Sequence, residues 1–352
     1  MITAKILFVF YLPSGGMETL NRQRCKALKK HGIDCHLLYL QNGTGMQNIS
    51  EIPTYITNED EEIKRIIKDG FNAIFVCSDI GLLQRIRTLG FTGKLIYEVQ
   101  GLGSYESAEK ILLQAKTNVV TYSNGILFPN TPHLINLIHA YYPATPKYCF
   151  HNCFDKDEFR YVSSEAPRFP IVGWVGRIEE NKNWKDYLEF SFRFLKHKPD
   201  TQFWMFIDDT LGDPQERMRF NKRVTQMGLT SSLKLHANVP HKQMANYFSM
   251  IGDSGGFLLS TSKVEGFGYA VIEAMSCRCP VLSSDSDGVK AFITHNTTGK
   301  FYTNEKIETA VPEALELLNN DLLRTSIIEQ AYNHLDVFNL DTYASEFKNI
   351  LK

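Results

Sequence analysis

Two glutamates eight positions apart, Glu265 and Glu273, enclose a glycine-bearing turn in this chain. The surrounding pattern predicts a strand that ends before residue 262, a turn at residues 266–268 and a helix that begins near Tyr269. Such a turn leaves backbone N–H groups and the positive end of the helix dipole available to an anion such as a diphosphate. Two surface glutamates on an ordinary helix would explain a bare Glu-x7-Glu spacing better, but the Gly-Phe-Gly turn favours a site.

The two carboxylates are predicted to serve different parts of one ligand. Glu265 lies in the loop and Glu273 inside the helix, so they lie up to about 12 Å apart. One carboxylate can therefore stand on each side of a bound diphosphate. A molecule that carries hydroxyls on both sides of a diphosphate is a nucleotide sugar.

Two cations follow another apolar segment, at residues 171–176. Arg177 is placed at the predicted carboxyl end of that strand, and Lys182 comes five residues later. Arginine offers a fork of donors to phosphate oxygens, and lysine offers a compact charge. Each cation alone would more often be solvated surface, but together with the turn at 266–268 they predict an anion site.

A second glycine turn, Gly15 and Gly16, follows the first apolar segment and precedes a helical pattern. These glycines would let backbone approach a ligand at a helix N-terminus, although a plain tight turn explains them equally well. The turn matches neither Gly-x-Gly-x-x-Gly nor a Walker loop, which argues against NAD and ATP.

These residues need a scaffold of alternating strands and helices. Apolar runs without polar interruption are typical of parallel strands that are covered on both faces. Together with the helical patterns between them, they predict an α/β fold of two doubly wound, Rossmann-like domains that face each other across a cleft, with a linker near residues 155–168. The predicted strands are residues 6–10, 35–40, 73–77, 95–99, 119–122, 148–150, 171–176, 203–207, 233–236, 257–259 and 281–283. The predicted helices are residues 19–30, 60–68, 184–196, 215–227, 241–250 and 269–277.

Composition limits the function classes. The chain has 352 residues, of which 43% are hydrophobic and 22% charged, as in an ordinary globular protein of two domains. A formal net charge of −1 gives no electrostatic argument for nucleic acid. There is no apolar stretch of about 18 residues and no signal-peptide pattern at the N-terminus, so we expect a cytoplasmic protein.

No metal is expected. The seven cysteines form no framework of zinc-finger spacing. Asp285 and Asp287 form an Asp-x-Asp pair, but the apolar residues before it and Gly288 after it favour a strand-to-loop turn. A basic run at residues 22–31 is predicted to be a solvated helix face, with weak peripheral contact to anionic lipid at the inner face of a membrane as the alternative.

Taken together, these residues resemble the GT-B glycosyltransferases, in particular the retaining family 4 enzymes. The resemblance covers almost the whole chain and is strongest from residue 171 to 290. The matching segments are residues 14–18 (glycine loop), 151–155 with Phe159 (entry to the linker), 175–177 with Lys182 (diphosphate segment), 262–268, 273–275 and 280–281 (donor block), and 338–352 (last helix). This likeness implies a first domain of residues 1–160 completed by a crossover helix at about 336–352, and a donor domain of residues 169–335.

The resemblance also implies residue roles. Glu265 would contact the donor sugar, Glu273 the ribose hydroxyls, and Arg177 and Lys182 the leaving diphosphate. Gln100 stands where many members carry a histidine; glutamine cannot act as a general base, but it can hydrogen-bond a sugar hydroxyl. The predicted catalytic residues are Arg177, Lys182, Glu265 and Gln100. The predicted donor-binding residues are Gly15, Gly16, Arg177, Lys182, Asn238, Val239, Ser262, Glu265, Gly266, Phe267, Gly268, Tyr269 and Glu273. Two further departures from the family pattern are Arg278 and Ala237, each at a usual glycine position.

The leading hypothesis is therefore a retaining, metal-independent transferase that moves a sugar from a nucleotide donor to an acceptor hydroxyl of a carbohydrate or glycoconjugate. UDP-glucose, UDP-GlcNAc and GDP-mannose all suit these residues, and neither the acceptor nor the oligomeric state is predicted. Two alternatives stay open. One is a nucleotide-sugar 2-epimerase or a phosphorylase of the same fold. The other is a catalytically silent subunit that binds nucleotide or carbohydrate.

Overall fold

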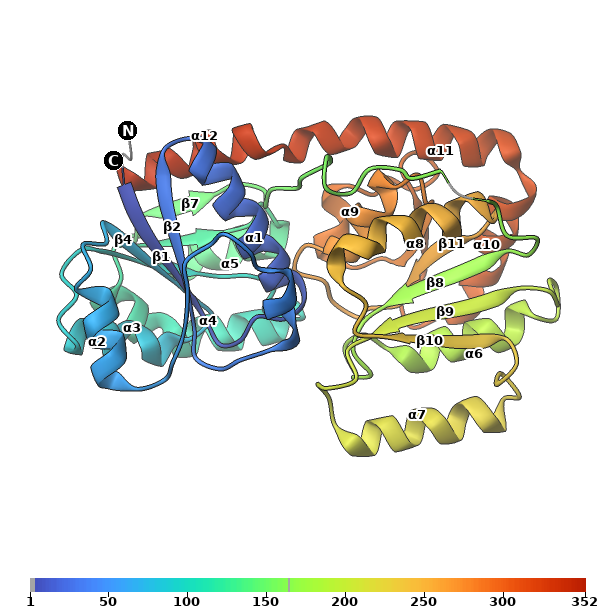
Figure 1. The fold of residues 1–352 in the computed structure, drawn as a ribbon, viewed down its shortest axis with the longest axis horizontal. Helices are drawn as coiled ribbons and strands as arrows, with labels where there is room; N and C mark the ends of the chain where they lie inside the picture. Colours follow the sequence, from blue (N-terminus) through green and yellow to red (C-terminus); the bar gives the residue numbers. More distant parts are fainter. Residues whose placement is uncertain (1–3, 164) are drawn as a thin grey trace. The chain divides into compact units, whose positions relative to one another are not determined.

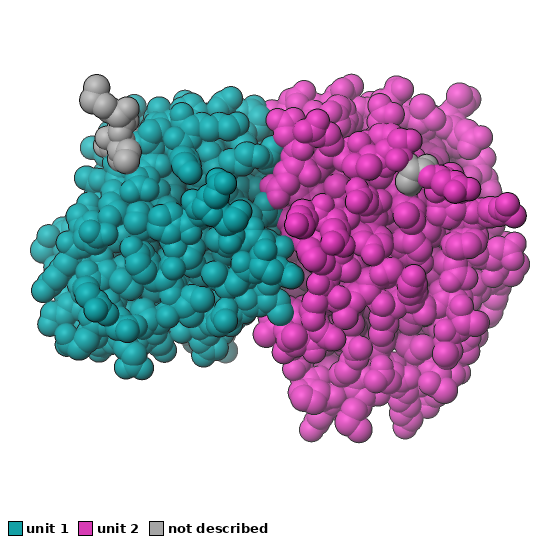
Figure 2. All heavy atoms as spheres, in the orientation of Figure 1, with its two compact units in different colours: residues 1–155, 338–352 teal, residues 156–337 magenta. Residues whose placement is uncertain are grey.

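The computed structural model describes residues 4–163 and 165–352. The chain divides into two compact units, residues 1–155 with 338–352 (unit 1) and residues 156–337 (unit 2), which Figure 2 shows in different colours. Each unit is built on one parallel sheet with helices on both faces (Figure 1). The prediction of two Rossmann-like domains is thereby confirmed.

Unit 1 contains a seven-stranded sheet of order β3-β2-β1-β4-β5-β6-β7 within the described residues. All neighbouring strands are parallel. Its strands are β1 (Ala4–Phe10), β2 (Ile33–Tyr39), β3 (Thr54–Ile56), β4 (Ala73–Cys77), β5 (Lys94–Glu98), β6 (Gly125–Phe128) and β7 (Lys147–Cys149). Its helices are α1 (Gly15–Lys30), α2 (Asp60–Ile67), α3 (Ile80–Thr88), α4 (Tyr105–Tyr122), α5 (Pro132–Tyr141) and α12 (Leu340–Leu351), with a 3₁₀ turn η1 (Thr44–Asn48).

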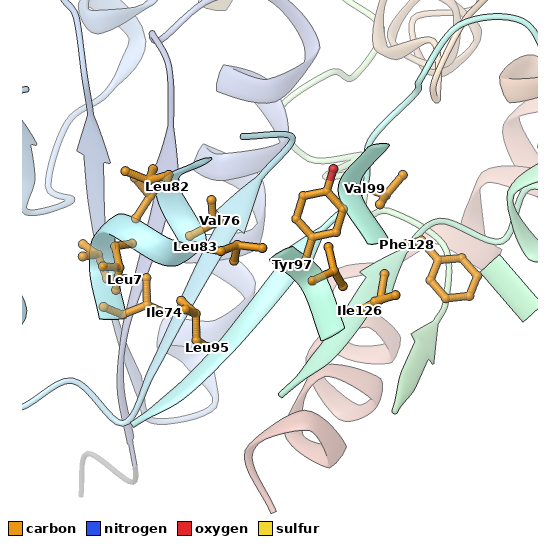
Figure 3. Close-up of a cluster of buried hydrophobic side chains, with 14 of the residues drawn as sticks. Leu7, Ile74, Val76, Leu82, Leu83, Leu95, Tyr97, Val99, Ile126 and Phe128 are labelled. Atoms are coloured by element: carbon orange, nitrogen blue, oxygen red, sulfur yellow. The ribbon is translucent and has the colours of Figure 1, made fainter. Parts of the chain in front are cut away.

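The alternation of side chains along β1 divides the core of unit 1 between two layers. Leu7 and Val9 join Ile74 and Val76 of β4 in a buried cluster (Figure 3), which helices α2 to α5 cover. Phe8 lies on the opposite face, because successive side chains of a strand alternate between faces. The uninterrupted apolar run of β1 is therefore explained by burial on both sides of the sheet.

The last helix covers that opposite face. Phe347 of α12 packs against Phe8 and Phe75, with ring centroids 5.8 Å and 4.8 Å apart. Helix α12 also contacts α1. The C-terminal segment of the chain thus completes the core of unit 1.

Unit 2 contains a six-stranded parallel sheet of order β10-β9-β8-β11-β12-β13 within the described residues. Its strands are β8 (Ile171–Val175), β9 (Gln202–Ile207), β10 (Leu233–Ala237), β11 (Phe257–Ser260), β12 (Val281–Ser284) and β13 (Lys300–Tyr302). Its helices are α6 (Trp184–Phe194), α7 (Pro214–Gln226), α8 (His241–Asp253), α9 (Tyr269–Ser276), α10 (Ala310–Asn319) and α11 (Asp321–His334). The 3₁₀ turns η2 (Asp287–Ala291) and η3 (Ile307–Thr309) also belong to unit 2, and η4 (Leu335–Phe338) spans its end.

Helices α8 and α9 share one face of this second sheet. Both contact its central strands, and they contact each other. A side chain at Gly173 of β8 would place its Cβ 2.7 Å from Ile251 Cδ1 of α8. The glycine therefore allows α8 to pack closely on the sheet, which brings α8 beside α9.

One strand prediction is wrong and several elements were not predicted. Residues 119–122, three β-branched and one aromatic, form the end of helix α4 rather than a strand. Ala108, Leu112, Ala115 and Val119 are buried at helical spacing, whereas Val120 is 57% exposed, so amphipathic packing overrides β propensity. The missed strands are β3, β6 and β13, and the missed helices include α10 and α11. They are short or lie where the apolar pattern is weak.

Candidate functional site

The predicted cations and carboxylates of unit 2 lie where the strand order of the sheet reverses. The chain leaves β8 toward β9, and the second half of the sheet starts on the other side of β8 with β11. Arg177 and Lys182 follow β8, whereas Ser262 and Glu265 follow β11. Ligands of open α/β sheets bind outside the carboxyl ends of the strands at such a switch point.

Hydrogen bonds hold the loops after β8 and β11 together. The Thr261 hydroxyl accepts from Trp174 Nε1 at 2.9 Å, and it donates its hydrogen toward the carbonyl oxygens of Lys182 and Asn183, at 2.9 Å and 3.1 Å. The backbone N–H of Lys263 donates to the carbonyl of Asn181 at 2.8 Å. Two loops that are far apart in the sequence thus form one surface.

Lys182 and Glu265 meet directly on this surface. Lys182 Nζ lies 2.6 Å from Glu265 Oε1, and the two side chains are 24% and 14% exposed. The structure therefore brings together a predicted diphosphate cation and the predicted sugar contact. Arg177 belongs to the same loop, but its guanidinium pairs with Glu179 at 3.3 Å and is 46% exposed.

A second ion pair links the same loops at their rim. Glu180 binds Lys263 and also Lys185, the latter at 2.9 Å. Hydrogen bonds from Lys263 and then Lys185 lower the pKa of Glu180 to about 2. The Glu180–Lys263 ion pair thus adds a contact between the loop after β8 and the loop after β11.

The glycine turn before α9 has the geometry that its sequence predicts. Gly268 has φ +88°, and a Cβ there would lie 2.8 Å from Val289 Cγ1, so both conformation and packing require glycine. The N–H of Gly288 donates to the Glu265 carbonyl at 3.1 Å. Gly266 lies in this turn, and Phe267 is buried with its ring 4.9 Å from that of Tyr269, the first residue of α9. The start of α9 is therefore packed against the 3₁₀ turn η2 that contains Gly288 and Val289.

Ser262 is buried on the strand side of this turn. Its carbonyl accepts a 2.5 Å hydrogen bond from the Ser284 hydroxyl of β12. The structure thus gives Ser262 a backbone contact that fixes the loop after β11 against the next strand.

Glu273 lies within α9, as predicted, and is almost completely buried. Its Oε1 lies 2.9 Å from Nε2 of His241, the first residue of α8. The imidazole also packs edge-on against Phe159, with ring centroids 4.8 Å apart. His241 was not predicted, because no local pattern reveals a contact between residues 32 positions apart.

The turn between β10 and α8 contains Asn238 and Val239. Asn238 has φ +50°, its N–H donates to the Ile207 carbonyl at 2.9 Å, and its side-chain amide binds Asp209. The turn therefore bends sharply at the carboxyl end of β10, on the same edge of the sheet as the loops after β8 and β11.

Unit 1 has its own switch point between β1 and β4. Gly15 and Gly16 form the first turn of α1 directly after β1, and both are exposed. Gly15 has φ +56° with no atom within 4 Å of a Cβ placed there. The structure places these two glycines at the expected edge of the sheet, in a different unit from the other predicted donor-binding residues.

Gln100 follows β5 and is held by a pair of carboxamides. Its Nε2 donates to Glu98 Oε1 at 3.0 Å and to Asn152 Oδ1 at 3.1 Å, while Asn152 Nδ2 donates to Gln100 Oε1 at 2.9 Å. An ionised carboxylate only accepts hydrogen bonds, so the amide nitrogen must face Glu98. Both hydrogens of that nitrogen are thereby used, and Gln100 retains acceptor capacity on Oε1.

A buried ion pair lies beneath Gln100 and corrects one prediction. Arg24 Nη1 lies 2.7 Å from Glu98 Oε1, and the two side chains are 1% and 0% exposed. The guanidinium also lies 3.5 Å from the centre of the Phe8 ring. The basic run at residues 22–31 is therefore not a wholly solvated face. Arg24 lies on the buried side of α1 together with Leu20, Ala27 and Leu28, a helical spacing that places its side chain toward the core.

Asp285 and Asp287 follow β12 in the strand-to-loop turn and the 3₁₀ turn that comes after it, where Lys290 Nζ lies 3.1 Å and 3.5 Å from their carboxylates. Throughout residues 4–163 and 165–352, no three His, Cys, Asp or Glu side chains gather in a way that could hold a metal ion. In the same ranges no helix combines the length and apolarity that crossing a bilayer requires.

Known proteins resemble this chain in sequence. The family described as "Glycosyl transferases group 1" matches residues 155–334, just over half of the chain. A poly(ribitol-phosphate) alpha-N-acetylglucosaminyltransferase of Staphylococcus aureus (strain COL) is 20% identical over 297 residues, which are 81% of this chain and 55% of that protein. An alpha-D-kanosaminyltransferase of Streptomyces kanamyceticus is 25% identical over 50% of this chain and 46% of its own. The chain spans about half the length of the curated relatives it matches.

Solved structures resemble the whole chain. Anabaena HepE, crystallised with UDP and glucose, has a TM-score of 0.83 at 15% identity, with 99% of both chains covered. The sucrose-phosphate synthase of Thermosynechococcus elongatus has a TM-score of 0.81 at 16% identity, covering 99% of this chain and 98% of its own. These likenesses confirm the predicted GT-B fold.

Proposed function

The chain belongs to the glycosyl transferases group 1 family, and from that membership we propose that it is a retaining glycosyltransferase that moves a sugar from a UDP- or GDP-sugar to an acceptor hydroxyl, without a metal ion. The observation that carries this proposal is the meeting of Lys182 and Glu265 at the switch point of unit 2, with a 2.6 Å contact. Glu273 lies on the helix that the same glycine turn opens.

The chemistry follows from which charges form during transfer. The bond between the anomeric carbon and the diphosphate oxygen breaks, a bond to the acceptor oxygen forms, and the departing phosphate takes the acceptor's proton. Positive charge develops on the sugar and negative charge on the leaving oxygen. Lys182, Arg177 and the N–H groups of residues 266–268 can stabilise the leaving diphosphate. Lys182 must then exchange its contact with Glu265 for phosphate oxygens, which the partial exposure of this pair allows.

The related proteins guide the choice of donor and acceptor. HepE was crystallised with UDP-glucose and with UDP and glucose, and the curated relatives include N-acetylglucosaminyl and kanosaminyl transferases. We therefore propose a UDP-sugar as the first donor to test, and a carbohydrate or glycoconjugate as the acceptor.

The test is release of nucleoside diphosphate from UDP-glucose, UDP-GlcNAc and GDP-mannose by the purified protein. With the active donor, Lys182→Ala should lower kcat by about 10²–10³-fold, because a group that stabilises transition-state charge is lost. Lys222→Ala, which removes an exposed lysine of α7, is the matched control and should keep wild-type rates.

Two outcomes would refute this assignment. Full activity in both Lys182→Ala and Glu273→Ala would contradict the roles of these residues. Conversion of UDP-GlcNAc alone into an epimer, without release of UDP, would identify an epimerase instead.

A further inference from the structure

The hydrogen bond between His241 and Glu273 joins two parts of the unit 2 site that the sequence treats separately. Glu273 lies in α9, and His241 is the first residue of α8 after the turn that contains Asn238 and Val239. We propose that His241 is a positioning residue, which holds the Glu273 carboxylate in the orientation that accepts the ribose hydroxyls of a nucleoside diphosphate. This inference rests on the proposed function and deepens it.

The direction of the bond follows from the chemistry of the two groups. An ionised carboxylate only accepts, so His241 Nε2 carries the hydrogen and donates to Glu273 Oε1 over 2.9 Å. Neutral and protonated imidazole can both donate in this way. The carboxylate has about four acceptor positions on its two oxygens, so one donor on Oε1 leaves capacity for two hydroxyls.

Burial makes a fixed donor necessary. The side chain of Glu273 is 5% exposed and that of His241 is 15% exposed. A carboxylate in such surroundings is costly unless hydrogen bonds compensate it. The glutamate side chain is also flexible, and a donor that fixes its rotamer before the ligand arrives reduces the entropy lost on binding.

The imidazole is itself held in place from two sides. Phe159 packs edge-on against it at 4.8 Å, and the Phe159 carbonyl accepts from Cys277 Sγ at the end of α9 at 3.5 Å. In the backbone before His241, Pro240 is the N-cap of α8. Two residues earlier, the Asn238 N–H donates a hydrogen bond to the Ile207 carbonyl. The histidine therefore links the turn after β10 to helix α9.

This link predicts that His241 acts on the ribose end of a bound nucleoside, through Glu273. Loss of the His241 donor should therefore weaken nucleotide binding while leaving the sugar-transfer groups Lys182 and Glu265 in place.

The experiment compares UDP and GDP with their 2′,3′-dideoxy forms by calorimetry. His241→Phe keeps a ring against Phe159 but removes the hydrogen-bond donor. For whichever of UDP and GDP the wild type binds, this variant should raise Kd about tenfold, in the range for a hydrogen bond to a charged group. His241→Gln, which retains an N–H donor, should restore Kd to within about threefold of the wild-type value. In turnover, His241→Phe should raise KM for the donor with little change in kcat.

The dideoxy nucleotide separates positioning from general structural damage. It should bind the wild type weakly, and neither His241→Phe nor Glu273→Gln should weaken it further. If His241→Phe does not fold, His241→Asn serves the same comparison, because its shorter amide does not reach the carboxylate.

Three results would overturn the inference. The first is a His241→Phe variant that binds UDP or GDP as tightly as the wild type does, and the second is a variant that weakens the normal and dideoxy nucleotides equally. Either result, with wild-type binding intact, refutes the role of His241 and leaves the proposed function standing. The third is a wild type that binds neither nucleotide, which refutes both.

Discussion

Unit 1 and unit 2 both place a carboxylate and a cation near the carboxyl ends of parallel strands, but they treat the charges differently. In unit 1, Glu98 and Arg24 form a pair that is 0% and 1% exposed. In unit 2, Glu265 and Lys182 form a pair that is 14% and 24% exposed. A buried pair cannot exchange partners without an uncompensated charge, whereas a partly exposed pair can. The Arg24–Glu98 pair therefore has a structural role beneath Gln100, whereas the Lys182–Glu265 pair can exchange its contact for a ligand.

The largest expected effect comes from breaking the buried pair. Arg24→Met should lower the free energy of unfolding of unit 1 by about 3–5 kcal/mol, because it leaves the Glu98 charge buried without its partner. Urea unfolding followed by a probe in unit 1 measures this change.

The matched change in unit 2 is Lys182→Met, for which we expect a loss of less than about 1 kcal/mol, because solvent compensates the partner. The double variant Arg24→Met with Glu98→Gln should recover part of the loss. Equal destabilisation by Arg24→Met and Lys182→Met would remove the distinction between the two pairs.

A pH-dependent effect is expected from Gln100→Glu. The introduced carboxyl would stand beside Glu98 in place of an amide nitrogen that is now 3.0 Å away, and like charges raise the pKa of a carboxyl. The pKa of the introduced carboxyl would be higher in the folded protein than in the unfolded chain, where it is about 4.3. The loss in free energy of unfolding is therefore absent below about pH 4.3 and grows as the pH rises toward the folded pKa. If the pKa of the introduced carboxyl is about one pH unit higher in the folded protein than in the unfolded chain, the full loss in free energy of unfolding is about 1.4 kcal/mol.

Unfolding measured from pH 4 to pH 8 checks this expectation. Gln100→Ala, which removes the amide without adding a charge, is the control and should show the pH dependence of the wild type. If both variants respond to pH alike, Gln100 does not face an ionised Glu98.

A small effect is also expected at the end of α9. Arg278 has φ +59°, a left-handed conformation that favours glycine after a helix, and its guanidinium lies 5.3 Å from the Tyr161 ring. Arg278→Gly and Arg278→Ala both lose the ring contact, but only glycine relieves the backbone. Arg278→Gly should therefore be more stable than Arg278→Ala by about 1 kcal/mol in thermal unfolding. A more stable alanine variant would mean that strain at this position is negligible.

Much of the scaffold follows from local sequence. Strand β4 and residues 203–207 of β9 are uninterrupted apolar runs, and parallel strands covered on both faces require such runs. The turn at Gly268 is also local, since its φ of +88° depends on the absence of a side chain. Residues 119–122 show the limit of this reasoning. Their β-branched and aromatic side chains favour a strand, but the apolar face at Leu112, Ala115 and Val119 makes them helical.

By itself, the sequence determined the alternation of strands and helices and the glycine turn that opens α9, because these depend on backbone preference and on the period of apolar residues. Only the tertiary structure decided which charges are buried and which side chains meet. Arg24 reaches Glu98 across 74 positions, Lys182 reaches Glu265 across 83, and His241 reaches Glu273 across 32. Such contacts arise from the order of strands in the sheet and the packing of helices on it, which no single stretch of sequence encodes.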